Sequence, residues 1–193
     1  MKNQLTCNME MTSSNTLFGL PTKDFMSPKV QQLFDDTCAI KSQEIILNAA
    51  GIPVSEERLR DEAISHGWYS PGCGTPLEAV GELMQIHGID VQSHIHASLY
   101  NLTAELAKGH PVIVGVDSGE LWRPGADEIS EDIEAGKIPD HALIVSGIEF
   151  NDDFSDGIVN VIDPGTGEYC HAYELEQFLD AWNDSDNFMI SIL

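Results

Sequence analysis

Basic side chains are scarce in this sequence. Its 193 residues include 9 Lys and Arg against 32 Asp and Glu, which gives a formal net charge of −23. Wrapping nucleic acid or lying on an anionic membrane needs a basic surface, so we expect neither kind of partner. The acidic composition favours solubility and, where a charged partner is involved, a basic one.

Cysteines are also few, and long apolar runs are missing. The four Cys residues form no CxxC pair, and they are too few for a disulfide scaffold in a chain of this length. No apolar run approaches the roughly 18 residues of a membrane-spanning helix. The first residues lack the basic and apolar parts of a signal peptide. We therefore expect a reduced, cytoplasmic protein, or one delivered by a secretion route that needs no signal peptide.

Apolar residues are plentiful enough for a core. They make up 42 % of the chain, more than a disordered acidic protein contains. At this length one domain is the natural count. Residues 1–28 are polar, lack periodicity and end at Pro28. We predict a flexible N-terminal arm over 1–28 and a single domain over 29–193.

The first half of that domain has helical patterns and the second half has strand patterns. Helix signals, including an N-cap at Ser55 and a capping box at Thr75, predict helices over 38–50, 55–66, 75–86 and 98–108, with a short strand near 89–93. Apolar runs predict strands over 111–116, 141–150, 157–162 and 188–193, with a helix over 173–182 and a long loop over 118–140. Helices followed by antiparallel strands indicate an α+β layering.

Three residues in this layout can carry chemistry. Cys38 opens an apolar helix, where the helix dipole favours a thiolate, although a buried structural cysteine is the alternative. His141 begins one predicted strand and Asp163 ends the next, so a hairpin would place the carboxylate beside the imidazole. Each signal alone is weak. In the order Cys, His, Asp, on a helix and two adjacent strands, they indicate a thiol hydrolase.

Around these residues the sequence resembles the bacteriocin-processing (double-glycine leader) peptidases, which are papain-like cysteine peptidases often fused to ABC exporters. The resemblance covers about 30–193 and rests on Gln32 with Asp36-Thr37-Cys38-Ala39, and on the runs GHPVIV at 109–114, HALIVSG at 141–147 and IDP at 162–164. It implies a papain-like α+β fold in which the nucleophile helix packs on an antiparallel sheet.

The resemblance also implies a role for each matched residue. Cys38 would be the nucleophile, His141 the general base and acid, and Asp163 the residue that orients the imidazole. Gln32, six residues before the cysteine, would be the oxyanion-hole glutamine, with the Cys38 backbone N–H as second donor. No cofactor is implied.

The sequence departs from the family pattern in several places. Ala39 follows the cysteine where the family usually has Gly, and a turn at 151–156 lengthens the spacing from His141 to Asp163. No exporter region follows, which predicts a standalone domain, and no Gly-Gly pair occurs in the chain. Standalone members of this group include interbacterial toxins and uncharacterised hydrolases.

The resemblance thus predicts a bacterial cysteine peptidase that cuts after glycine or another small residue in a protein or leader peptide. A toxin of this kind would have a cognate inhibitor or immunity protein as a partner. Two alternatives stay open: a catalytically silent module that docks a basic partner, and an acyl or amide transferase that uses the same residues.

Other candidates are weaker. Gly72, Gly74 and Trp122 are candidate substrate-binding residues at a cleft rim, with a flexible loop and a packed anchor as the alternatives. No metal site is predicted at the histidines near His94, because no Cys or carboxylate completes a spaced set. The run at 151–157 resembles a calcium loop, but Phe154 occupies an oxygen-ligand position, which predicts a turn. Cys7, Cys73 and Cys170 receive no role.

Acidic residues are concentrated at the C-terminal end. Residues 138–193 contain many Asp and Glu but no Lys or Arg, and they include His141 and Asp163. A solvated surface is one interpretation, and a docking face for basic segments is the other. A negative field there would raise the pKa of the imidazole and attract cationic substrates.

Overall fold

A computed structural model of the protein describes residues 16–19, 29–125, 128, 130, 133–134 and 138–193, without the side chains of Tyr169 and Cys170. Its helices are α1 (Cys38–Ala49), α2 (Glu56–His66), the 3-10 turn η2 (Leu77–Ala79), α3 (Glu82–Ile86), α4 (Leu99–Ala107), α5 (Ser118–Trp122) and α7 (Leu175–Asn183). Its strands are β1 (Thr16–Gly19), β2 (Val91–His94), β3 (Val112–Val116), β4 (His141–Phe150), β5 (Gly157–Asp163), β6 (Glu168–Glu174) and β7 (Met189–Ile192).

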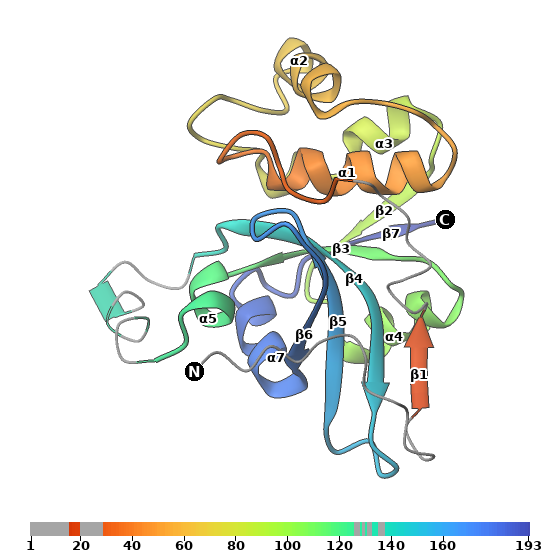
Figure 1. Ribbon diagram of the computed structural model, residues 1–193, viewed down its shortest axis with the longest axis vertical. Coiled ribbons are helices and arrows are strands. Elements are labelled where there is room, and N and C mark those ends of the chain that lie inside the picture. The colour runs from red at the N-terminus through yellow and green to blue at the C-terminus, as the bar shows by residue number, and fades with distance from the viewer. Residues whose placement is uncertain (1–15, 20–28, 126–127, 129, 131–132, 135–137) are drawn as a thin grey trace.

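The described strands form one antiparallel sheet: six follow the order β2-β7-β3-β4-β5-β6, and β1 lies off this path and pairs with β4. Strand β4 is the longest: its first half pairs with β3 through His141–Val145, and its second half pairs with β1 through Gly147–Phe150. Helices α1, α2 and α3 lie on one side of the sheet, with α4, α5 and α7 on the other (Figure 1).

Alternating side chains divide the core between the two faces of the sheet. In β4, Ala142 and Ile144 pack toward α1, while Leu143 and Val145 pack toward α4 and α7. Because side chains alternate along a strand, a strand buried on both faces is apolar at almost every position. The predicted α+β class is confirmed, and helix α1, which begins with Cys38, packs on the antiparallel sheet as expected.

Local capping signals mark the starts of α2 and α4, whereas the capping box predicted at Thr75 does not form, because the Thr75 hydroxyl has no hydrogen-bond partner among the described residues. Ser55 caps α2 by accepting from the backbone N–H of Arg58, and Ser98 forms a capping box with Asn101 at α4. The helix predicted over 75–86 is wrong as a continuous element. It breaks at Gly81, which has φ +101°, and the side-chain Oε1 of Gln43 then accepts from the N–H groups of Gly81 and Met84 at the start of α3.

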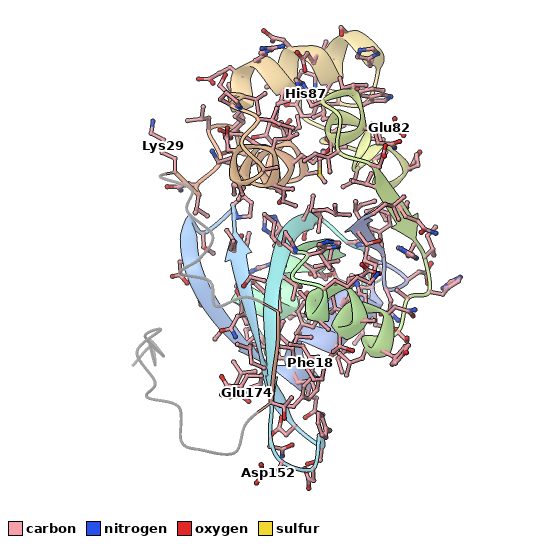
Figure 2. All side chains as sticks on the ribbon, turned by 90° about the vertical axis from the view of Figure 1, so that its right-hand side faces the viewer. Phe18, Lys29, Glu82, His87, Asp152 and Glu174 are labelled. Carbon is pink, nitrogen blue, oxygen red and sulfur yellow. The ribbon has the colours of Figure 1, made fainter. Side chains whose placement is uncertain are left out.

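The remaining differences concern short elements. Helix α5 occupies the start of the loop predicted over 118–140, and β6 extends to Glu174, so α7 begins two residues later than the predicted helix. Within the predicted arm, Thr16–Gly19 forms β1, and its Phe18 ring lies 5.8 Å from that of Phe150 (Figure 2). The rest of 1–28 lies outside the described residues. Among those described, no helix is long and apolar enough to cross a bilayer.

Candidate active site

Cys38 is the first residue of α1, at the end of the loop 32–37. Its thiol is half-buried against the core cluster between α1 and the sheet. Because the first N–H groups of a helix have no partner within the helix, the Cys38 backbone N–H is available to a ligand at this end. The prediction that the cysteine begins a helix is confirmed.

His141 and Asp163 lie side by side in the β4–β5 hairpin. His141 begins β4 and Asp163 ends β5, and the imidazole Nε2 is 2.7 Å from Asp163 Oδ1. Asp163 is fully buried, and its carboxylate also accepts from the backbone N–H of Gly165 at 2.8 Å. The predicted hairpin therefore forms, and it places His141 next to Asp163 as predicted.

The imidazole of His141 lies between this carboxylate and the Cys38 thiol. Because Nε2 faces Asp163, the ring nitrogen left for the hydrogen bond with Cys38 is Nδ1. Burial lowers the pKa of His141, but the hydrogen bonds to Asp163 and Cys38 and their charges outweigh it and raise the pKa to about 10. Burial raises the pKa of Asp163, yet the hydrogen bond from His141 leaves it lowered overall. The arrangement favours a charged imidazolium beside the sulfur.

Trp122, at the end of α5, contacts both members of this pair. Its indole Nε1 donates to Asp163 Oδ2 at 3.0 Å, and its ring meets that of His141 edge-on at a centroid distance of 4.9 Å. The side chain remains 41 % exposed. Trp122 is thus a packed anchor with one exposed face, and its contact with substrate stays a prediction.

Because Gly165 has no side chain, the Trp122 ring can pack directly against its backbone. A Cβ at this position would lie 2.8 Å from the Trp122 ring and 2.9 Å from Cε1 of His141. Real Cβ atoms do not approach other atoms so closely, so a larger residue would displace one of the two rings.

Gln32 lies in the segment that runs alongside the turn after Asp163. Its backbone N–H donates to the carbonyl of Pro164 at 3.0 Å, and its side-chain Nε2 donates to the carbonyl of Phe34 at 2.8 Å. Its Oε1 is buried and has no hydrogen-bond partner among the described residues. One N–H of the amide is left over, and its role toward an oxyanion stays a prediction.

Glu56 is a residue that sequence reasoning missed. As an acid in the first turn of α2 it looks the same as its exposed neighbour Glu57, but its side chain is buried against the loop 32–37. Its carboxylate accepts from the backbone N–H of Leu33 and from the hydroxyl of Thr37. Nothing in the local sequence pattern separates the two glutamates, because the partners of Glu56 lie about 20 residues away.

Gly72 and Gly74 lie in a short hairpin beside the same loop. Asp36 connects the two segments: its carboxylate accepts from the hydroxyl of Tyr69 at 2.7 Å and from the backbone N–H of Gly72 at 2.6 Å. The guanidinium of Arg60 lies over the ring of Phe34, 4.5 Å from its centroid. The two glycines are therefore close to the segment that precedes Cys38, and their contact with substrate stays a prediction.

The other histidines bind elsewhere. His87 pairs with Glu62 at 2.6 Å and His94 with Ser191 at 3.0 Å, so these two of the histidines considered for a metal have separate partners. Within the described ranges, no group of three or more His, Cys, Asp or Glu side chains is arranged to hold a metal ion. Residues 151–156 close the β4–β5 hairpin as a turn.

The fold with Cys38, His141 and Asp163 in contact is that of the papain-like cysteine peptidases. The family model described as Peptidase_C39 like family matches residues 25–188, and the chain belongs to this family. The resemblance found in the sequence is thereby confirmed. Among curated proteins, none matches the chain at a significant level.

Three solved structures share the fold at low sequence identity. A Bacillus anthracis protein assigned to the C39-like peptidases has a TM-score of 0.63 and 18 % identity, over 86 % of this chain and 94 % of that one. A double glycine motif protease from an AMS/PCAT transporter, in complex with the leader peptide, has a TM-score of 0.57 and 13 % identity, over 87 % and 91 %. The peptidase domain of Streptococcus ComA, a bifunctional ABC transporter involved in quorum sensing, has a TM-score of 0.54 and 17 % identity, over 85 % and 96 %.

Proposed function

We propose that the protein is a cysteine peptidase that hydrolyses a peptide bond after glycine or another small residue. The observation that carries this proposal is the buried His141, held between the Cys38 thiol and the Asp163 carboxylate with its pKa raised to about 10. Any buried histidine needs partners for both ring nitrogens, but here the two partners are a thiol and a carboxylate, the arrangement in which an imidazole can activate a cysteine nucleophile.

In the proposed mechanism the Cys38 thiolate attacks the carbonyl carbon of the scissile bond. The carbonyl oxygen becomes an oxyanion, stabilised by the Cys38 backbone N–H and the free N–H of the Gln32 amide. The imidazolium of His141 gives its proton to the leaving amine as the C–N bond breaks, which leaves a thioester. A water molecule then attacks the thioester, His141 accepts its proton, and the acid product and the free cysteine are released.

The choice of substrate rests on the family and on a neighbour. Family membership supports a peptide substrate, and the double glycine motif protease was solved with its leader peptide bound. An extended segment with a Gly-Gly or Gly-Ala site is therefore the first substrate to try. The half-exposed side chains of Leu33, next to Gln32, and of Trp122, in contact with His141, offer apolar surface to a peptide.

The test compares wild-type protein with Cys38→Ala and Asp163→Asn on peptides that contain Gly-Gly, Gly-Ala or Leu-Leu at their centre. We expect cleavage after glycine by the wild type, none by Cys38→Ala, and a loss of about 100-fold or more in Asp163→Asn. Equal rates for wild type and Cys38→Ala would overturn the proposal. Product release that speeds up with an added amine, and yields the amide, would indicate the transferase instead.

A further inference from the structure

We propose that Glu56 is a positioning residue for the oxyanion hole. In this inference its carboxylate fixes the loop 32–37, which joins Gln32 to Cys38, and so sets where the two oxyanion donors lie. The inference rests on the proposed function, because it concerns how the same site stabilises its transition state.

The contacts of Glu56 lie at the two ends of this loop. At one end, the backbone N–H of Leu33 donates to both carboxylate oxygens, at 2.8 Å to Oε1 and 3.0 Å to Oε2. At the other end, the hydroxyl of Thr37 lies 2.6 Å from Oε1. Leu33 directly follows Gln32 and Thr37 directly precedes Cys38, so a single side chain holds the neighbours of both proposed donors.

The carboxylate of Glu56 lies in the protein interior, where an unpaired charge is unfavourable. Glu56 is 1 % exposed and Thr37 is fully buried. Lys41 compensates the charge from one turn beyond Cys38: its Nζ lies 3.7 Å from Glu56 Oε2 and 2.6 Å from Glu44 Oε2, and its side chain is 3 % exposed. A buried ion pair with neutral hydrogen-bond donors around it gives little net stability, but it defines one geometry and penalises others.

The loop is anchored a second time from the sheet. The backbone N–H of Gln32 donates to the carbonyl of Pro164, next to Asp163. The Gln32 amide itself donates to Phe34 O, within the loop. The direction of that amide therefore depends on the shape of the loop, and the shape depends on Glu56 at one side and Pro164 at the other.

Within the described part of the chain, Glu56 makes its hydrogen bonds and ion pair with Leu33, Thr37 and Lys41, and not with His141, Trp122 or Asp163. His141 donates a hydrogen bond to Asp163 on β5 and shares another with Cys38 on α1. Loss of the Glu56 carboxylate should therefore weaken oxyanion stabilisation and leave the thiolate–imidazolium pair in place. Loss of a residue with a merely structural role would leave both the oxyanion stabilisation and the thiolate–imidazolium pair unchanged, or would weaken both.

The experiment compares Glu56→Gln with Glu57→Gln, a matched change at the exposed neighbour in the same helical turn. Three readouts are needed: the pH profile of Cys38 alkylation by iodoacetamide, kcat and KM on the Gly-Gly peptide, and inhibition by a peptide aldehyde that ends in Gly-Gly. The Cys38 thiol adds across the aldehyde C=O, with sulfur bonding to carbon and the proton moving to oxygen, so the aldehyde reports on the oxyanion hole.

For Glu56→Gln we expect kcat and aldehyde affinity to fall by about 10- to 100-fold, because removal of one oxyanion donor costs about 100- to 1,000-fold. KM and the alkylation profile should stay within about twofold of wild type, and Glu57→Gln should match wild type throughout. In a Gln32→Ala background, measured under single turnover, Glu56→Gln should cost clearly less than it costs in the wild type, because the effect through the Gln32 donor is already lost and only the effect through the Cys38 donor remains.

Two results would overturn the inference alone: a full additional loss in the Gln32→Ala background, or an alkylation profile that shifts as far as kcat falls. If Glu56→Gln does not fold, Thr37→Val goes through the same cycle with the same two overturning results, because the Thr37 hydroxyl also lies 2.9 Å from the Phe34 carbonyl that accepts from the Gln32 amide. A wild-type protein that neither cleaves the peptide nor binds the aldehyde overturns the proposed function and this inference together.

Discussion

The indole N–H of Trp122 donates to Oδ2 of Asp163, while His141 occupies Oδ1 of the same carboxylate at 2.7 Å. The two oxygens of this buried acid are thus divided between an imidazole and an indole that also touch each other edge-on. The tryptophan comes from α5, on a part of the chain outside the β4–β5 hairpin, so it ties the loop after β3 to the acid–base pair.

Trp122→Phe removes the hydrogen bond and keeps most of the ring. The hydrogen bond from Trp122 contributes to the lowered pKa of Asp163, so this pKa should rise and the carboxylate should support the His141 imidazolium less. We expect kcat to fall by about three- to tenfold, which corresponds to the net value of about 0.5 to 1.5 kcal/mol of a typical hydrogen bond. Trp68→Phe, away from this pair, is the control, and equal kinetics in the two variants would contradict the expectation.

Gly165→Ala tests the space beside His141. Its Cβ would lie 2.9 Å from Cε1 of the imidazole and 2.8 Å from the Trp122 ring, so one ring has to move. We expect Cys38 alkylation at neutral pH to slow by about tenfold and the protein to lose about 1 to 3 kcal/mol of stability, as overpacking usually costs. Iodoacetamide labelling and urea unfolding measure the two effects. Alkylation at the wild-type rate would show that the imidazole tolerates the added methyl group.

The sequence predicted those contacts that depend on local patterns. Cys38 could be placed at a helix start by the apolar spacing after it, and the apolar runs of β4 and β5 with a turn between them placed His141 beside Asp163. Glu56 and Trp122 could not be placed, because their hydrogen bonds cross 23 and 41 residues of sequence. The element β6 was missed because this edge strand, with the sequence EYCHAYE, has no apolar run to indicate it.

His141 gives a pH prediction with a definite sign. Its pKa in the folded protein, about 10, lies above the usual value of 6.5, so protonation favours the folded state. The stability it contributes is complete below about pH 6.5 and is lost as the pH rises through about 10. Peptide cleavage should be lost over the same alkaline range, because the leaving amine then lacks its proton donor.

An NMR titration of the His141 ring measures this directly. In Cys38→Ala the hydrogen bond and the charge from the thiol are gone, and both raise the pKa in the wild type. The pKa should therefore fall in this variant while staying above that of Asp163→Asn/Cys38→Ala, where burial acts without either partner. A wild-type ring that titrates near 6.5 would mean that the imidazole is not held between the two charged groups.

The charge of the substrate should affect the rate of cleavage, and the structure indicates which acidic residue causes this effect. No Lys or Arg occurs among residues 138–193, which form β4 to β7 and α7. Asp152 lies at the far tip of the hairpin, away from α1 (Figure 2). Glu168, by contrast, is exposed and pairs in register with Asp163. Among these acids, Glu168 is therefore the one we expect to act on a bound peptide.

Peptides with Lys on both sides of the Gly-Gly site should be cleaved faster than peptides with Glu there, by about three- to tenfold at low salt. The advantage should fade toward 0.5 M salt, where the screening length falls to roughly 4 Å. Glu168→Gln should remove a large part of it, whereas Asp152→Asn, at the distant tip, should remove almost none. An uncharged peptide serves as the reference and should respond to neither substitution. A preference that persists unchanged in high salt would point to a specific pocket for the basic side chain in place of a long-range field.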